Sequence, residues 1–296
     1  MKSKLNEQML PCWLEYRWIS PSSIGWRMGV GESYRLKWLK WLKSLPLEEQ
    51  QDYIKQFPEP KMWKWGGLWE ESEEEPEEDF GYVNEFHSVT FWNKDGIPSY
   101  SYSDLLKDVG NGMSKRYLHF WGATPDKNGR ITKSCLSQWW MEDFQVDTIT
   151  YCCMEQYMMA EKARLFGDKK IEEKILHCNV PGKIKALGRK VEGFEEDVWQ
   201  ACRYSIVLNG NYYKFSQNKR LWNFLNKTKD TILVEASPYD RIWGIGLAED
   251  KKEAVQPEHW KGINLLGFAL MEVREELRRV LKGLESFDRQ KRGENE

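Results

Sequence analysis

The stretch YCCMEQYMMAEKARLF, residues 151–166, decides what fold and what kind of site this chain can have. It predicts a helix that starts near residue 154 and stops at Gly167. Spacings of four, seven and eleven residues fall near whole turns, so one face of this helix carries Glu155, Met159, Lys162 and Phe166. A carboxylate and an ammonium therefore share that face about 11 Å apart along the axis. Either a ligand lies between them, or both reach solvent or other partners.

The composition bounds the class of protein. The chain has 296 residues and a formal net charge of -2, which excludes nucleic-acid binding through bulk basicity alone. No apolar run approaches the roughly 18 residues of a membrane span, and the N-terminus lacks the apolar stretch of a signal peptide. The six cysteines form no C-x-x-C pair and the four histidines are scattered. We therefore expect a soluble cytoplasmic protein with no metal site, no cofactor and no membrane partner.

Tryptophan is unusually frequent, with 16 residues, and aromatic residues make up 14% of the chain. One interpretation is a core that is rich in large flat side chains. The other is that some of the rings form stacking surfaces for a base.

The first half of the chain predicts short elements around an acidic run. Helical patterns cover 33–45 and 47–57, and eight of the ten residues in 70–79 are acidic. Such a run stays solvated, so it is interpreted as a surface loop or linker. Residues 89–102 look like two short strands around an Asp95-Gly96 turn.

The second half shows a clearer pattern. Strands are predicted within 116–122 and 231–236, and helices over 171–178, 197–210, 221–228 and 265–284. Asn179, Pro181 and Gly182 are expected to end the first of these helices, and Asn209-Gly210 the second. The result is an α+β fold, predominantly helical with a few short strands. Without βαβ alternation or phosphate-loop and nucleophile-elbow motifs, it is not a Rossmann, P-loop or α/β-hydrolase protein.

A strand that ends at Glu235 leads directly into a loop of polar and glycine residues. Gly244 and Gly246 could let the backbone approach a ligand closely. Trp243 offers a flat face, and Asp240 offers a carboxylate for base catalysis or for stabilising positive charge. Glu235 itself either points inward with a partner or outward into water.

Two polar stretches adjoin helices. Lys214 could meet a phosphate and Asn218 could bind a base or a sugar hydroxyl, although the same residues could simply form a capped turn. Asn264 opens the last helix as an N-cap. The N-terminus of that helix also favours an anionic group such as a diphosphate.

Several motifs follow one another in a specific order. They are Leu136-Ser-Gln-Trp139, Tyr151-x-x-x-Glu155-Gln-Tyr-Met-Met-Ala-x-Lys162-Ala, Lys185-x-Leu-Gly188-Arg189, Trp199, Lys214-Phe215-x-Gln217-Asn218, Val234-Glu235-x-Ser237-x-x-Asp240-x-x-Trp243-Gly-x-Gly246 and Trp260-x-Gly-x-Asn264-x-Leu-Gly267. This ordered set resembles the NADAR superfamily of YbiA-like proteins. The chain departs from the pattern at Gln138, where many relatives have Asn.

The resemblance implies a division of the chain. It covers residues 116–285 as a NADAR/YbiA-like catalytic domain and leaves 286–296 as a tail. Residues 1–115 are then an N-terminal extension of helices and a hairpin, with an acidic linker at 70–79.

The resemblance also implies hydrolysis of N-glycosidic bonds. The substrate is either a ribosylamino-pyrimidine intermediate of riboflavin biosynthesis or ADP-ribose attached to guanine, including guanine in DNA or RNA. A carboxylate would stabilise the oxocarbenium ion or activate water, while an acid protonates the leaving nitrogen. The catalytic candidates are Glu155, Asp240 and Lys162, and the substrate-binding candidates are Trp243, Gly244, Gly246, Lys214, Asn218, Ser237, Arg189, Trp199 and Asn264.

The alternative is a non-catalytic module that uses the same pocket to bind ADP-ribose or another NAD-derived metabolite, in a stress or phage-defence pathway. Binding without cleavage of any substrate would favour that hypothesis.

Overall fold

A computed structural model of the chain describes residues 8–63, 92–93 and 96–291. The chain divides into two compact units. The first comprises Met1–Phe80, Val146–Thr148 and Glu275–Glu296, and the second comprises Gly81–Gln145 and Ile149–Arg274. The acidic run 70–79 lies outside the described residues, and the division at residue 115 stays a prediction.

The first unit is held together by aromatic rings. Its elements are α1 (Cys12–Glu15), α2 (Val30–Lys43), α3 (Leu47–Gln56) and the last part of α10. Trp13 packs edge-on against Trp38 and against Trp63, each with ring centroids 5.7 Å apart. The indole of Trp38 also donates a 2.9 Å hydrogen bond to the hydroxyl of Tyr53. These tryptophans form a core, and the helices predicted over 33–45 and 47–57 are confirmed.

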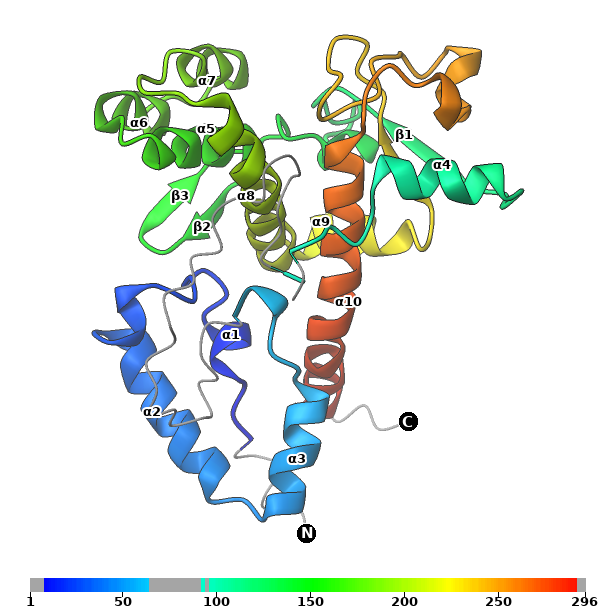
Figure 1. The fold of residues 1–296 in the computed structure, drawn as a ribbon. Coiled ribbons are helices and arrows are strands. Elements are labelled where there is room, and N and C mark those ends of the chain that lie inside the picture. Colours follow the sequence, from blue (N-terminus) through cyan, green and yellow to red (C-terminus); the bar gives the residue numbers. More distant parts are fainter. Residues whose placement is uncertain (1–7, 64–91, 94–95, 292–296) are drawn as a thin grey trace. The chain divides into compact units, whose positions relative to one another are not determined.

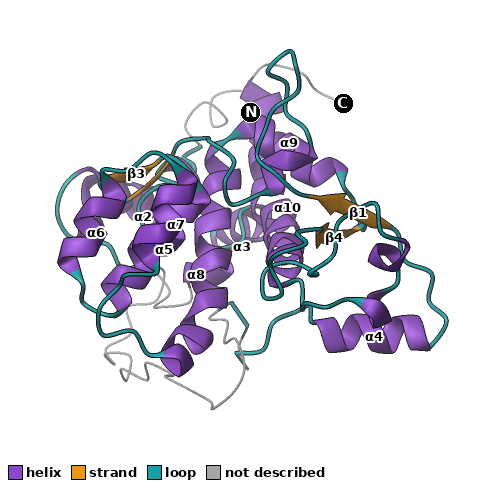
Figure 2. Ribbon diagram, turned by 90° about the horizontal axis from the view of Figure 1, so that it is seen from above, coloured by secondary structure: helices purple, strands orange, loops and turns teal. Residues whose placement is uncertain are grey.

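The second unit contains most of the helices and nearly all of the residues in paired strands (Figures 1 and 2). Its helices are α4 (Tyr102–Gly110), α5 (Met154–Leu165), α6 (Lys169–Leu176), α7 (Pro181–Gly188), α8 (Glu196–Gln217), α9 (Lys219–Lys227) and the first part of α10 (Leu265–Lys291). Its strands are β1 (Tyr117–Phe120), β3 (Ile149–Tyr151), β4 (Ile232–Glu235) and the first two residues of β2 (Phe144–Val146). The predicted α+β, mainly helical fold is confirmed. Among the described helices, none combines the length and the apolar character that a bilayer span requires.

Two strands from distant parts of the chain form a parallel pair. Strands β1 and β4 are in register from Tyr117–Ile232 to Phe120–Glu235, and β2 pairs with β3 in a separate two-stranded sheet. Gly267, in the first turn of α10, packs directly on β4, since a Cβ there would lie 2.0 Å from the carbonyl oxygen of Leu233. The carboxyl end of β4 therefore has a fixed position.

Helix α8 continues past the end that the sequence predicts at Asn209-Gly210. Gly210 lies in its interior, where an added Cβ would lie 2.5 Å from the ring of Tyr157 and 2.6 Å from Met154 on α5. This glycine allows α5 and α8 to approach closely. The prediction that α8 ends at Asn209-Gly210 was wrong, because the helix continues to Gln217.

Helix α7 is missing from the sequence prediction. Pro181 occupies its first turn. Backbone N–H groups there have no acceptor within the helix, so the missing N–H of a proline costs nothing. It therefore begins a helix as well as following one. Gly188 on α7 packs against Met159 of α5, since a Cβ there would lie 2.0 Å from the sulfur.

The strands expected within 89–102 do not form in the described part, residues 92–93 and 96–101. Trp92 donates its indole hydrogen to Asn209 of α8 at 2.8 Å. The amide of Ser99 donates to the carboxylate of Glu272 on α10 at 3.0 Å. The backbone amide of Ser99, which could otherwise pair with a neighbouring strand, is thus bonded by a side chain on a helix.

Candidate active site

Glu155 lies in the first turn of α5 and is held by a preceding loop. Its amide donates to the carbonyl of Gln138 at 2.9 Å, and its Oε2 accepts a 3.1 Å hydrogen bond from the indole of Trp139. The residue is 3% exposed, and Oε1 is buried without a hydrogen-bond partner. One carboxylate oxygen is thus oriented by the protein, and the other has no hydrogen-bond partner among the described residues.

Lys214 supports this loop from below. It is fully buried, and its Nζ donates to the carbonyl oxygens of Cys135 and Ser137 at 2.8 and 3.0 Å. The phosphate-binding role expected for Lys214 is therefore wrong for this arrangement, because the ammonium is enclosed and its hydrogens are in use. Lys214 instead positions the loop that holds Glu155.

Asn218 is also used within the protein. Its side-chain amide donates to the carbonyls of Asp143 and Lys214, at 3.1 and 3.0 Å. It joins the end of α8 to the loop before β2 rather than presenting its amide hydrogens to a base or sugar.

Glu235 ends β4 with both of its backbone polar groups bonded. Its amide donates to Oδ1 of Asn264 at 3.0 Å, and its carbonyl accepts from the amide of Ile245 at 2.9 Å. The Asn264 amide nitrogen donates in turn to the carbonyl of Leu233 at 2.9 Å. Asn264 is fully buried and binds β4, so neither the predicted side-chain cap nor substrate binding uses it.

Asp240 shapes the loop that follows β4. Its Oδ1 accepts from the amides of Ile242 and Trp243, at 2.9 and 2.8 Å. Gly244 and Gly246 serve the same loop. A Cβ on Gly244 would lie 2.7 Å from the carbonyl oxygen of Glu235, and Gly246 has φ +66°. These glycines let the loop approach its own chain, which corrects the expectation that they approach a ligand.

The charge of Asp240 acts on both Glu155 and Glu235, and the charge of Glu155 acts on Glu235. Burial raises the pKa of Glu155 to about 7, and the charge of Asp240 adds to the increase. Burial also raises the pKa of Glu235 to about 8, with further increases from Asp240 and Glu155. The structure therefore brings together the two acids that the sequence selected, Glu155 and Asp240, and adds Glu235.

The cation beside these carboxylates is Lys185, which was not among the catalytic or substrate-binding residues predicted from the sequence. Its charge lowers the pKa of both Glu155 and Glu235, and its Nζ lies 5.9 Å from the ring centroid of Trp139. The exposed Arg189, which was predicted, also lowers the pKa of Glu155. Both residues lie on or at the end of α7, the helix that the sequence did not predict.

Lys162 belongs to a different group of side chains. Its Nζ lies 3.9 Å from the ring centroid of Phe194 and 5.5 Å from that of Trp199. Burial lowers the pKa of Lys162, and the charge of Glu196 partly opposes this. Lys162 is not among the charges that shift the pKa of Glu155, so a direct partnership of these two residues is not seen.

The most accessible ring at the site is one that the sequence left unassigned. Trp139, whose indole binds Glu155, is 39% exposed, whereas Trp243 and Trp199 are 9% and 8% exposed. Ser237 is also buried, and its hydroxyl accepts from the amide of Tyr239. Motif position alone could not show which tryptophan presents a free face.

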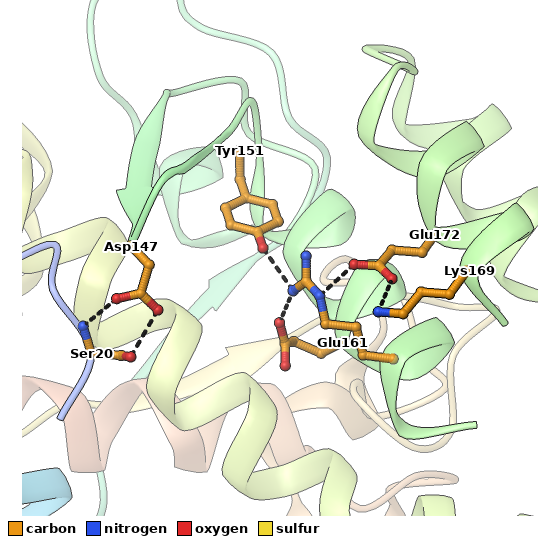
Figure 3. A network of polar contacts seen from close by, with 7 residues as sticks. Ser20, Asp147, Tyr151, Glu161, Lys169 and Glu172 are labelled. Carbon is orange, nitrogen blue, oxygen red and sulfur yellow. Dashed lines mark hydrogen bonds and ion pairs between the residues drawn. The ribbon is translucent and has the colours of Figure 1, made fainter. Parts of the chain in front are cut away.

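The other end of α5 carries a fully different network (Figure 3). Arg164 donates to Tyr151, to Glu161 and to Glu172, and Lys169 binds the second oxygen of Glu172 at 3.0 Å. The Ser20–Asp147 contact drawn in the same view belongs to the first unit. In the Arg164 network, opposite charges are paired.

Comparisons with known proteins identify the family of this chain. The model of the NADAR domain matches residues 119–278. The chain is 42% identical over 166 residues to N-glycosidase R617 of Acanthamoeba polyphaga mimivirus, covering 54% of this chain and 96% of that protein. It is 31% identical over 133 residues to N-glycosidase YbiA of Escherichia coli strain K12, covering 45% and 74%. It is also 29% identical over 177 residues to the riboflavin biosynthesis protein VVA0006 of Vibrio vulnificus, covering 60% and 42%.

Proposed function

The chain belongs to the NADAR family and is a hydrolase of N-glycosyl bonds, and from this premise we propose that Glu155 and Glu235 cleave the bond between a ribose and a nitrogenous base. The observation that carries the proposal is the buried carboxylate of Glu155. Trp139 orients one of its oxygens, and the other has no partner among the described residues. Such a group suits a ligand that is not yet bound.

The two glutamates differ in a way that suits different roles. The pKa of Glu235 is about 8, so near neutral pH it is largely protonated and can donate a proton. The pKa of Glu155 is about 7, so a substantial fraction is ionised. Paired carboxyl groups with separated pKa values are how one site supplies both an acid and a base. Because the two groups interact, a measured pH profile reports the pair rather than either residue alone.

The proposed reaction then proceeds with a complete balance of atoms. The bond between the anomeric carbon and the base nitrogen breaks, its electron pair stays on nitrogen, and Glu235 supplies the proton. The ionised carboxylates of Glu155 and Asp240 stabilise the oxocarbenium charge that develops. Water then adds to the anomeric carbon and gives its proton to Glu155. For a ribosylamino-pyrimidine phosphate the products are ribose phosphate and the free base, and for ADP-ribosylguanine in an oligonucleotide they are ADP-ribose and unmodified guanine in the strand. Glu155 then passes its proton to solvent and Glu235 takes one up, which restores the site.

Other side chains around Glu155 support binding. The half-exposed ring of Trp139 offers a stacking face for the base, and Lys185 keeps part of the Glu155 population ionised. The exposed Arg189 can reach the sugar or a phosphate. Trp243 and Ser237 shape the loop around Asp240, which keeps that carboxylate in place.

The substrate is proposed at the level of a ribosylated base. Two candidates are a ribosylamino-pyrimidine phosphate, which the riboflavin-related relative favours, and ADP-ribose attached to guanine.

The test incubates the full chain separately with ribosylaminouracil phosphate and with an oligonucleotide that carries ADP-ribosylguanine, and detects products by mass spectrometry. We expect release of free base from the first substrate or of ADP-ribose from the second, and a loss of at least ~10²-fold in kcat for Glu155→Gln. Binding of ADP-ribose without cleavage of either substrate would contradict the proposal and favour a binding module.

A further inference from the structure

Arg203 carries a buried positive charge that, within the described residues, is paired only through one long contact, with Glu196. It lies on α8 and is 8% exposed. Its Nε is buried and has no hydrogen-bond partner. The nearest carboxylate oxygen belongs to Glu196, 3.9 Å from Nη1, and the Glu196 side chain is 55% exposed. This contact is too long for a hydrogen bond.

A guanidinium in this position is energetically unfavourable on its own. Burying an ion costs free energy unless an opposite charge and hydrogen bonds compensate. Burial lowers the pKa of Arg203, and the charges of Glu196 and Asp240 oppose this only in part. Among the described residues, Glu196 is the one carboxylate within ion-pair distance of this guanidinium, and Nε has no acceptor, so a bound anion would supply the missing hydrogen bond.

The surroundings of Arg203 show where that anion would lie. Glu196, Trp199 and Arg203 are spaced three and four residues apart, so they share one face of α8. Lys162 of α5 reaches the same face, with its Nζ 5.5 Å from the ring centroid of Trp199. Asp240 lies close enough to affect Arg203 as well as Glu155. The cationic group thus adjoins the carboxylates of the proposed catalytic site.

We propose that Arg203 and Lys162 form a subsite for the phosphate or diphosphate group of the ribosylated substrate. The inference rests on the proposed function, because it assigns a further part of the same substrate. A guanidinium presents two parallel donors that match two phosphate oxygens, and a lysine adds a point charge. Glu196 acts as an exposed, loosely held counter-ion that the incoming phosphate displaces.

The first experiment measures binding without catalysis. Inorganic pyrophosphate is titrated into the full chain, and the Tm is recorded by differential scanning fluorimetry. We expect pyrophosphate to raise the Tm of the natural chain and of Arg220→Met, which alters an exposed arginine on α9. The shift should be absent in Arg203→Met, reduced in Arg203→Lys, and reached at a lower concentration in Glu196→Gln. Equal shifts in all variants, or no shift in the natural chain, would overturn the inference.

The second experiment compares substrates with and without phosphate. Arg203→Met should raise KM for the phosphorylated substrate at least about tenfold and leave KM for the dephosphorylated riboside unchanged. Equal KM values for the natural chain and Arg203→Met on the phosphorylated substrate would remove Arg203 from binding, while the proposed hydrolysis would stand. If the natural chain cleaves the N-glycosidic bond of no substrate, the proposed function fails, and the pyrophosphate titration still decides whether Arg203 binds an anion.

Discussion

The charged side chains at the two ends of helix α5 differ in how many partners they have. At its N-terminal end, Glu155 is almost fully buried with one oxygen lacking any partner. At its C-terminal end, Arg164 reaches oxygen atoms of Tyr151, Glu161 and Glu172 (Figure 3). Both ends belong to one rigid helix, so the difference does not come from backbone geometry.

This difference distinguishes structural charges, which are paired within the protein, from working charges, which lack partners and would contact a ligand. A network in which each charge meets an opposite charge holds elements together, even though Nη2 of Arg164 is buried without a hydrogen-bond partner. A buried carboxylate without a full set of partners weakens the folded state, and such a group fits a role in which a ligand completes it. The same contrast holds between Arg164 and Arg203, one with three oxygen partners and the other with a single long contact.

The largest effect is expected at the second working carboxylate. Glu235→Gln keeps the size of the side chain but cannot transfer a proton. We expect kcat to fall about 10²-fold. In the natural chain, activity should fall above pH 8 as Glu235 loses its proton. The residual activity of the variant should not show this fall. Steady-state kinetics between pH 5 and 9 measure both. An unchanged profile would place Glu235 with the structural charges.

Arg164→Met tests the paired end of the helix. It leaves Glu161 and Glu172 facing each other without the guanidinium between them. Because the Arg164 side chain is 25% exposed, solvent screens part of the effect, and we expect a loss of about 2 kcal/mol in the free energy of unfolding. Urea denaturation measures it.

The matched variant is Arg203→Met, for which we expect no loss of stability in the absence of phosphate. A similar destabilisation in both variants would remove the distinction between paired and unpaired arginines.

Lys214→Met addresses the support beneath Glu155. The variant leaves the carbonyls of Cys135 and Ser137 without their donor, which costs about 1–3 kcal/mol. It also removes a buried charge whose pKa burial lowers to about 8, and this offsets part of the cost. We expect a net loss of about 1 kcal/mol, together with a several-fold lower kcat at unchanged KM. A change in stability alone would mean that the loop does not position Glu155.

The smallest effect is expected for Trp139→Phe, which keeps a ring but removes the indole donor. Because that hydrogen bond lowers the pKa of Glu155, its loss should shift the acidic limb of the pH–rate profile to higher pH. We expect kcat at neutral pH to fall by about threefold to tenfold, in keeping with the loss of one hydrogen bond to a charged group. An acidic limb at the same pH as in the natural chain would show that the indole contributes only to packing.

The sequence predicted the elements that have a strong periodic pattern. The long last helix was found from its apolar spacing, the buried strand β4 from its run of β-branched residues, and the end of helix α5 from Gly167. Helix α7 was missed, because Pro181 and Gly182 fit a helix end as well as a helix start. Lys185 lies on that helix and was therefore missed as well, although its charge lowers the pKa of both Glu155 and Glu235.

The chemistry of the site was only partly predictable for a related reason. Glu155 and Asp240 were selected by residue type and position, and the structure brings their charges together. A sequence does not show which way a polar side chain points, so it could not reveal that Lys214 and Asn264 face the protein interior. Nor could it show that Gly210 serves helix packing instead of a helix end.

The most direct test of the central claim is the pH dependence of stability in Glu155→Gln, measured alongside turnover. In the natural chain, the unfolded state loses the Glu155 proton above pH 4.5, whereas the folded state keeps it until about pH 7. The natural chain therefore loses stability relative to Glu155→Gln as pH rises through this window. We expect equal stability near pH 4, and above pH 7 a variant that is about 2–3 kcal/mol more stable with turnover at least ~10²-fold lower. A variant that turns over normally, or that is less stable than the natural chain at pH 8, would contradict the account.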